Sequence, residues 1–142
     1  MRSIVTASAE ETENFAQELA RILRPDDILA FFGGLGMGKT TFVRGLARGL
    51  GGQDEVSSPT FSLVHEYRTQ PKLYHFDMYR VACFDDLYST GFFDYLDTGA
   101  ILAIEWSENI AGALPDQVIR VCFERLDDTH RRITVEGDER FC

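Results

Sequence analysis

The segment from Gly33 to Thr40, which reads GGLGMGKT, constrains the fold of this chain more than any other. It matches the pattern G-x-x-x-x-G-K-[ST] at every fixed position. Residues 28–32 before it form a continuous apolar run typical of a buried parallel strand, and residues 40–50 after it place apolar side chains at helical spacing. This order of strand, glycine-rich loop and helix is the context in which the pattern binds phosphate.

The chemistry of phosphate binding explains the residue types in this loop. Glycines let successive backbone N–H groups point inward, and the helix N-terminus adds the positive end of its dipole. We expect Lys39 to contact the β- and γ-phosphates, Thr40 to ligate Mg²⁺ and Thr41 to contact the α-phosphate. The expected nucleotide-binding residues of the loop are Gly36, Met37, Gly38, Lys39, Thr40 and Thr41.

A flexible glycine-rich turn is the alternative interpretation of this loop. Lysine is rare in the chain, since only Lys39 and Lys72 occur, and this favours the nucleotide-binding interpretation. The guanine-specifying N-K-x-D and the switch motif D-x-x-G of GTPases are both absent from the sequence. We therefore expect ATP rather than GTP, with Mg²⁺ as its metal ion.

Two acidic residues in predicted strands are candidates for binding the metal ion or orienting the attacking water. Glu105 ends the apolar strand 101–104, the place where P-loop ATPases carry an acidic residue beside Mg²⁺ and the attacking water. Asp77 lies among aromatic residues, where a carboxylate needs a metal ion or an arginine such as Arg80. We expect both carboxylates to be catalytic and to bind the metal. The alternatives are a plain surface acid for Glu105 and a structural ion pair for Asp77.

The remaining chain predicts a mixed α/β fold. Ser8 and Glu11 form a capping box, which predicts a helix after a short strand at 3–6. Residues 61–68 and 73–79 predict an antiparallel hairpin, and 118–123 and 132–135 predict two more strands. Short helices are expected near 84–87, near 92–96 and after Ser107. Because no repeat or linker interrupts the sequence, we predict one domain over residues 1–142.

Charge and hydropathy limit the classes of partner. The net charge of −9 and the pI near 4.7 argue against a chain that binds DNA or RNA unaided, because neutralising phosphates requires clustered lysine and arginine. No apolar run approaches the length needed to cross a membrane, and the polar start lacks a signal sequence, so we expect a cytoplasmic protein. The three cysteines are widely spaced and suit reduced thiols.

Several blocks in order resemble the TsaE (YjeE) family of ATPases, which assist the synthesis of threonylcarbamoyladenosine in tRNA. The resemblance covers nearly the whole chain. Met37 is a departure, because the family often has alanine there, but a side chain at a variable loop position can point away from the nucleotide. The matching blocks are 33–46, 57–61 (SSPTF), 75–80 (HFDMYR), 105–108 (EWSE) and 114–115 (LP).

The resemblance implies a P-loop NTPase-like mixed sheet, with a parallel core and added antiparallel strands, flanked by helices. It also implies weak intrinsic ATPase activity and association with a TsaB–TsaD pair, so that tRNA is involved only indirectly. Thr60 would act as a switch threonine that responds to the γ-phosphate, and Thr12 would lie near the adenine. A stand-alone small-molecule kinase and a nucleotide-sensing module without turnover remain alternatives. The kinase is disfavoured because residues 81–98 lack the arginines of a phosphate lid.

Three further features have two interpretations each. Trp106, the only tryptophan, either packs in the core or contacts the nucleotide pocket or a partner. His65 and His75 either are ordinary strand histidines or form a metal site with Glu66 or Asp77. The aromatic residues between 84 and 95 either cover the core or face a partner.

Overall fold

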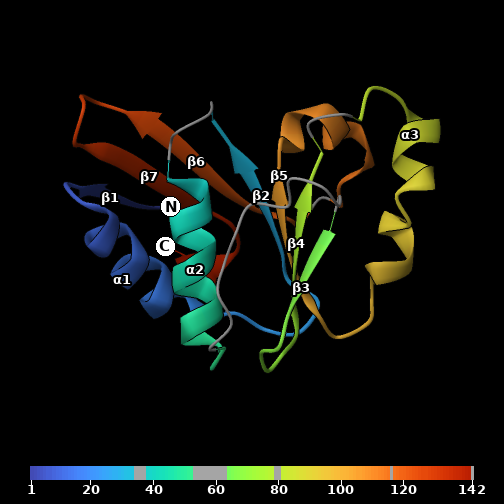
Figure 1. Ribbon diagram of the computed structural model, residues 1–142, viewed down its shortest axis with the longest axis horizontal. Helices are drawn as coiled ribbons and strands as arrows, with labels where there is room; N and C mark the ends of the chain where they lie inside the picture. Colours follow the sequence, from blue (N-terminus) through green and yellow to red (C-terminus); the bar gives the residue numbers. More distant parts are fainter. Residues whose placement is uncertain (34–37, 53–63, 79–80, 116, 142) are drawn as a thin grey trace.

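The computed structural model describes residues 1–33, 38–52, 64–78, 81–115 and 117–141 (Figure 1). Within these ranges one seven-stranded sheet has the order β1-β7-β6-β2-β5-β4-β3. The strands are β1 (Arg2–Thr6), β2 (Ile28–Phe32), β3 (Val64–Tyr67), β4 (Leu73–Asp77), β5 (Ile101–Glu105), β6 (Ile119–Arg125) and β7 (Arg131–Glu136). The helices are α1 (Ala9–Ala20), α2 (Lys39–Gly49) and α3 (Phe84–Ser89), with 3-10 segments η1 (Phe92–Tyr95), η2 (Ser107–Ala113) and η3 (Glu139–Phe141).

The centre of the sheet is parallel and its edges are antiparallel. Strand β2 pairs in parallel with both β5 and β6, and β4 extends the parallel part on the other side of β5. Strands β7 and β1 add to one edge and β3 to the other, all in antiparallel pairs. The predicted mixed sheet with a parallel core and antiparallel additions is therefore confirmed.

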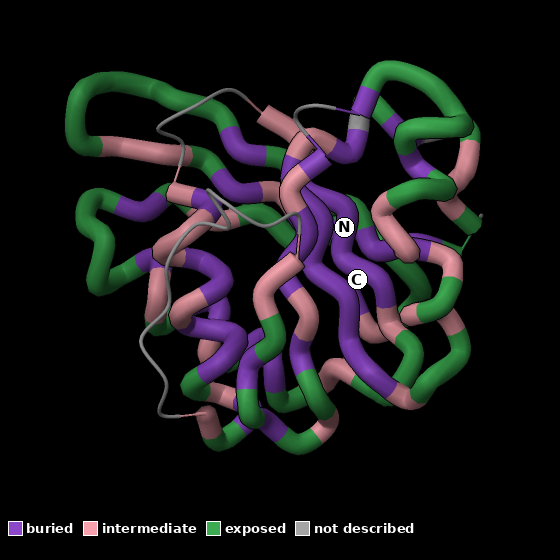
Figure 2. Tube along the Cα trace, turned by 45° about the vertical axis from the view of Figure 1, so that its right-hand side comes forward, coloured by how far each residue is buried: buried purple, intermediate pink, exposed green. Residues whose placement is uncertain are grey.

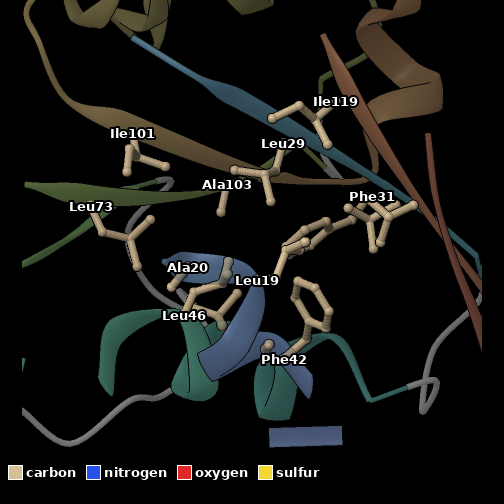
Figure 3. Packing of buried hydrophobic residues seen from close by; sticks show 14 of the residues in the cluster. Leu19, Ala20, Leu29, Phe31, Phe42, Leu46, Leu73, Ile101, Ala103 and Ile119 are labelled. Carbon is tan, nitrogen blue, oxygen red and sulfur yellow. The ribbon is translucent and has the colours of Figure 1, made fainter. Parts of the chain in front are cut away.

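Apolar side chains fill both faces of the sheet. On one face, α1 and α2 cover a core that includes Leu29 and Phe31 of β2 (Figure 3). On the other face, α3, η1 and η2 cover a second core around Phe76 and Ile104. Figure 2 shows the central strands as buried tubes between more exposed loops. Continuous burial of Ile28–Ala30 explains why this strand reads as an unbroken apolar run.

Most predicted elements are present, with shifted ends. Ser8 caps α1 as predicted, since its side chain accepts from the Glu11 N–H at 3.1 Å, but the Glu11 carboxylate accepts from the Ala7 N–H and not from that of Ser8. Strand β4 begins at the predicted residue, while the outer parts of the predicted hairpin, 61–63 and 79, lie outside the described residues. The prediction that Ser107 caps a helix is wrong, because its buried hydroxyl instead donates to the Ile104 carbonyl at 2.8 Å.

The aromatic residues between 84 and 95 divide between the two interpretations. Phe92 is fully buried, and its ring meets that of Phe76 at 5.4 Å between centroids. Phe84 and Tyr88 lie on the outer side of α3, where they are 65% and 69% exposed. Core packing thus accounts for Phe92 but not for Phe84 and Tyr88.

Two smaller predictions have simple outcomes. Neither Cys83 nor Cys122 forms a disulfide, and Cys142 lies outside the described residues. In the described part of the chain, no helix is both long enough and apolar enough to cross a membrane.

Helices α1 and α2 lie side by side in near-contact of their backbones (Figure 1). A Cβ atom on Gly45 would come within 2.3 Å of the Glu13 carbonyl oxygen and 2.7 Å of the Ala16 Cβ. One turn later, a Cβ on Gly49 would meet the Ala20 Cβ at 2.5 Å. These two glycines therefore set the distance between the helices.

An arginine attaches the C-terminal segment to the connection between α1 and β2. The Arg140 guanidinium donates to both carboxylate oxygens of Asp27, at 2.9 and 3.0 Å, and to the Ile22 carbonyl at 2.9 Å. It also bonds Asp138, and together the two carboxylates raise the pKa of Arg140 further above its already high value. Phe141, the next residue, is fully buried. Hydrogen bonds and burial thus hold the C-terminal segment against the α1–β2 connection.

Replacing Gly45 by alanine is expected to lower the free energy of unfolding by about 1–3 kcal/mol, because the helices must move apart. Helix propensity alone would stabilise the variant by about 1 kcal/mol. Urea unfolding measures the difference. Gly112→Ala is the control, because nothing lies within 4 Å of its added Cβ. A stabilised Gly45→Ala protein would contradict the close contact.

Replacing Arg140 by glutamine is expected to lower the free energy of unfolding by about 2–3 kcal/mol, since it leaves the half-buried Asp27 carboxylate without its cation. Arg125→Gln removes an exposed pair with Asp128 and should change stability by less than about 1 kcal/mol. Thermal and urea unfolding compare the two variants. Equal effects would show that the Arg140 contacts contribute no more than a surface pair.

Candidate phosphate-binding site

The glycine-rich loop connects the carboxyl end of β2 to the start of α2. Gly33, directly after β2, has φ of +134°, and a Cβ there would lie 2.8 Å from the Phe123 carbonyl oxygen, so only glycine fits. Gly38 is the N-cap of α2 with φ of +90°, and no side chain in the described ranges caps it. The first N–H groups of α2 are therefore suited to an anion. The predicted contacts of Gly36 and Met37 lie outside the described residues.

Lys39 is the first residue of α2 and is 94% buried, with 6% of its surface exposed. Its Nζ donates to the Gly33 carbonyl oxygen at 2.6 Å. The same Nζ lies 5.1 Å from the centroid of the Trp106 ring, within range of a cation–π interaction. The ammonium group therefore lies between the loop and the residue that follows β5.

Core packing of Trp106 is confirmed, while its contact with a nucleotide or a partner stays a prediction. Part of its surface packs against the core on the α3 side of the sheet, and its ring also faces Lys39. Its φ of +60° is unusual for a residue with a side chain and marks a sharp change of direction after Glu105. The tryptophan thus connects the loop to the end of β5.

Three threonines lie near the start of α2. Thr40 and Thr41 are half-buried in its first turn, where their backbone N–H groups precede the helical hydrogen bonds. Thr12, from α1, is buried, and its hydroxyl is 2.8 Å from that of Thr6. Its Cγ2 is 3.9 Å from the position of a Cβ on Gly38. The contact between the two helices therefore brings Thr12 to the loop.

The two predicted carboxylates end neighbouring parallel strands. Asp77 and Glu105 are register partners in the β4–β5 pair, and the Met78 N–H extends this pairing to the Glu105 carbonyl oxygen at 3.0 Å. Side chains alternate along a strand, so both carboxylates project from the face that α1 and α2 cover. The interpretation of Glu105 as a surface acid is wrong, because the residue is only 7% exposed.

A histidine is bonded to Glu105. His75 of β4 is fully buried, and its Nε2 lies 3.0 Å from Glu105 Oε2. His65 stands opposite His75 in the hairpin, as the metal-site interpretation required, but its ring stacks on Tyr67 at 4.4 Å between centroids. Among the described residues, no group of three or more histidine, cysteine and acidic side chains is placed to hold a metal ion.

The pairing of His75 with Glu105 was not predicted, and a signal for it existed. The side chains at positions 73, 75 and 77 lie on one face of the sheet, and Glu105 of the neighbouring strand projects from the same face. What the sequence lacked was the register, which pairs His75 of β4 with Ala103 of β5 and so places Glu105 two residues further along the same face. Thr60 and Arg80 lie outside the described residues.

These side chains form a donor set that suits a magnesium nucleotide. The uncapped start of α2 and the Lys39 ammonium suit phosphate, and the Thr40 hydroxyl with two carboxylates supplies the hard oxygen ligands that Mg²⁺ prefers. The Lys39–Trp106 contact links the two halves of this set. The arrangement agrees with a topology in which ligands bind beyond the carboxyl ends of parallel strands.

Comparison with known proteins identifies the family. The family model described as threonylcarbamoyl adenosine biosynthesis protein TsaE matches residues 6–133. The chain belongs to the TsaE family. It is 37% identical over 131 residues to the tRNA threonylcarbamoyladenosine biosynthesis protein TsaE of Treponema pallidum, covering 92% of this chain and 97% of that protein. Its identity to the Haemophilus influenzae TsaE is 42% over 118 residues, which cover 82% and 75% of the two chains.

A solved structure supports the same family. The crystal structure of Bacillus subtilis YdiB superposes with a TM-score of 0.80 at 31% identity, covering 98% of this chain and 87% of that one. The likeness therefore extends across nearly the whole of this chain. The resemblance expected from the sequence blocks is confirmed.

Proposed function

We propose that this TsaE-family protein acts in the biosynthesis of tRNA threonylcarbamoyladenosine as an accessory subunit that binds ATP with Mg²⁺ and hydrolyses it slowly. Its proposed partner is a cytoplasmic TsaB–TsaD pair, which it resets between turnovers, with tRNA involved only indirectly. The contact of Lys39 with Trp106, adjacent to Glu105, carries the proposal. This contact supports the proposal because it joins the lysine expected to bind phosphate to the residue that directly follows Glu105.

The first part of the proposed function is nucleotide binding. Lys39 and the first N–H groups of α2 hold the phosphates, and Thr40 binds the metal through its hydroxyl. Thr12 lies beside Gly38 and contacts the nucleotide near its base. Bound Mg²⁺ neutralises charge that develops on the phosphates during transfer.

The second part is hydrolysis. Glu105 orients the attacking water or binds the metal, and Asp77 completes the acidic end of the β4–β5 pair. Thr60, by the family resemblance, senses the γ-phosphate. The acidic character of the chain supports a protein rather than a nucleic acid as the direct partner, because a net charge of −9 repels a phosphate backbone.

The alternatives differ in the fate of the γ-phosphate. A small-molecule kinase forms ADP quickly only with an acceptor metabolite, and a sensor binds ATP without releasing phosphate. Phosphate release with and without the TsaB–TsaD pair separates the three functions. We expect slow release that changes when the pair is added. Phosphorylation of a metabolite, with no binding to the pair, would exclude the proposed function.

Replacing Lys39 by methionine is expected to weaken ATP binding roughly 10- to 100-fold, because one charge-assisted phosphate contact is lost while the buried stem is kept. Isothermal titration calorimetry with ATP and Mg²⁺ measures the affinity. Lys72→Met is the matched control, since this only other lysine pairs with Glu66 on the surface. Equal affinities in the two variants would remove Lys39 from the site.

Replacing Glu105 by glutamine is expected to leave ATP affinity nearly unchanged and to lower the hydrolysis rate about 100-fold or more. Phosphate release under saturating ATP measures the rate. Asp77→Asn is the comparison, and Glu66→Gln is the control because Glu66 lies on the neighbouring β3 and pairs with Lys72 on the surface. Full hydrolysis by Glu105→Gln would assign the reaction to Asp77 or to the partner.

A further inference from the structure

The buried histidine that is hydrogen-bonded to Glu105, His75, is not among the residues that the proposed function requires. His75 has no exposed surface, although an imidazole is costly to bury unless its nitrogens are bonded. Its Nε2 lies 3.0 Å from Oε2 of Glu105. Within the described ranges, its Nδ1 has no hydrogen-bond partner. The residue therefore bears an energetic cost that an apolar side chain at this position would avoid.

The chemistry of the two groups fixes the direction of the hydrogen bond. A carboxylate oxygen only accepts, so Nε2 must carry the proton and donate it to Oε2. The imidazole ring has little freedom to turn, since it is fully buried in a close-packed part of the sheet. It also sits between His65 of β3 and Ala103 of β5 in the sheet register. A fixed donor thus points at one oxygen of the carboxylate.

The position of the bond relates it to the phosphate site. His75 and Asp77 are two residues apart on β4, and Glu105 is the register partner of Asp77, so all three project from one face of the sheet. Trp106, the next residue after Glu105, contacts Lys39. A bond at Oε2 leaves the lone pairs of Oε1 for a second partner.

We propose that His75 is a positioning residue: its Nε2–H holds the Glu105 carboxylate in one orientation, ready to bind the metal or to orient water. This inference rests on the proposed function, because it assigns Glu105 a reaction to be positioned for. Groups that orient a metal ligand typically change metal affinity or activity roughly 10- to 100-fold when removed. A purely structural histidine would affect stability without this selectivity.

The test compares two substitutions at the same position. His75→Leu keeps an apolar volume and removes the donor, while His75→Gln keeps an N–H donor. We expect His75→Leu to lower kcat for ATP roughly 10- to 100-fold and to raise the Mg²⁺ concentration for half-maximal binding of a non-hydrolysable ATP analogue by a similar factor. Metal-free nucleotide affinity should stay within about twofold. His75→Gln should recover much of both losses.

His65→Leu is the matched control, because it removes the opposite histidine of the hairpin, which stacks on Tyr67. It should leave kcat and the Mg²⁺ dependence unchanged. A second measurement uses only the wild-type protein and requires no enzymatic assay. ¹⁵N-resolved NMR of the histidine rings reports which ring nitrogen carries the proton. We expect the Nε2–H form for His75.

The outcomes separate this inference from the proposed function. A wild-type protein that binds ATP and Mg²⁺ but releases no phosphate contradicts the proposed hydrolysis, and the Mg²⁺ dependence of the His75 variants still decides the role of His75. Wild-type rates in His75→Leu, a His75→Gln variant no better than His75→Leu, or a proton on Nδ1 alone would each overturn the inference. A wild-type protein that binds no nucleotide would overturn both.

Discussion

The near-contact of α1 and α2 is the constraint on which the site depends. Gly45 and Gly49 let the two helices approach until a single added methyl group would collide with α1. This approach brings Thr12 of α1 to Gly38 at the start of α2. It also packs both helices onto the face of the sheet from which Asp77 and Glu105 project. The two described ends of the glycine-rich segment therefore contact different elements: Gly33 follows β2, and Gly38 lies next to Thr12 of α1.

The sequence predicted what is encoded locally. The loop from Gly33 to Thr40 implies a strand before it and a helix after it, and the apolar run 28–32 implies a parallel, doubly covered strand. Glu105 could be selected because it ends a second such run. The two strands and the helix are confirmed, because each rests on a short segment with its own apolar pattern, while the role of Glu105 stays a prediction.

What the sequence did not predict depends on register and on contacts between distant segments. The bond between His75 and Glu105 joins residues 30 positions apart and exists only in one alignment of β4 with β5. The guanidinium of Arg140 contacts Asp27, which lies 113 positions away in the sequence, and no local sequence pattern predicts that contact. Ser107 fits the composition of a helix cap, but burial beside β5 turned its hydroxyl to a strand carbonyl. Tertiary packing decided each of these cases.

The hydrogen bond from Lys39 to the Gly33 carbonyl has a thermodynamic consequence. A phosphate that takes this ammonium must compete with a carbonyl oxygen already 2.6 Å away and with the face of an indole ring. Only the difference between the old and new contacts contributes to affinity. For the nucleotide that we propose as ligand, Lys39 would exchange one partner for another, so its net contribution to affinity would be smaller than that of a lysine without these contacts.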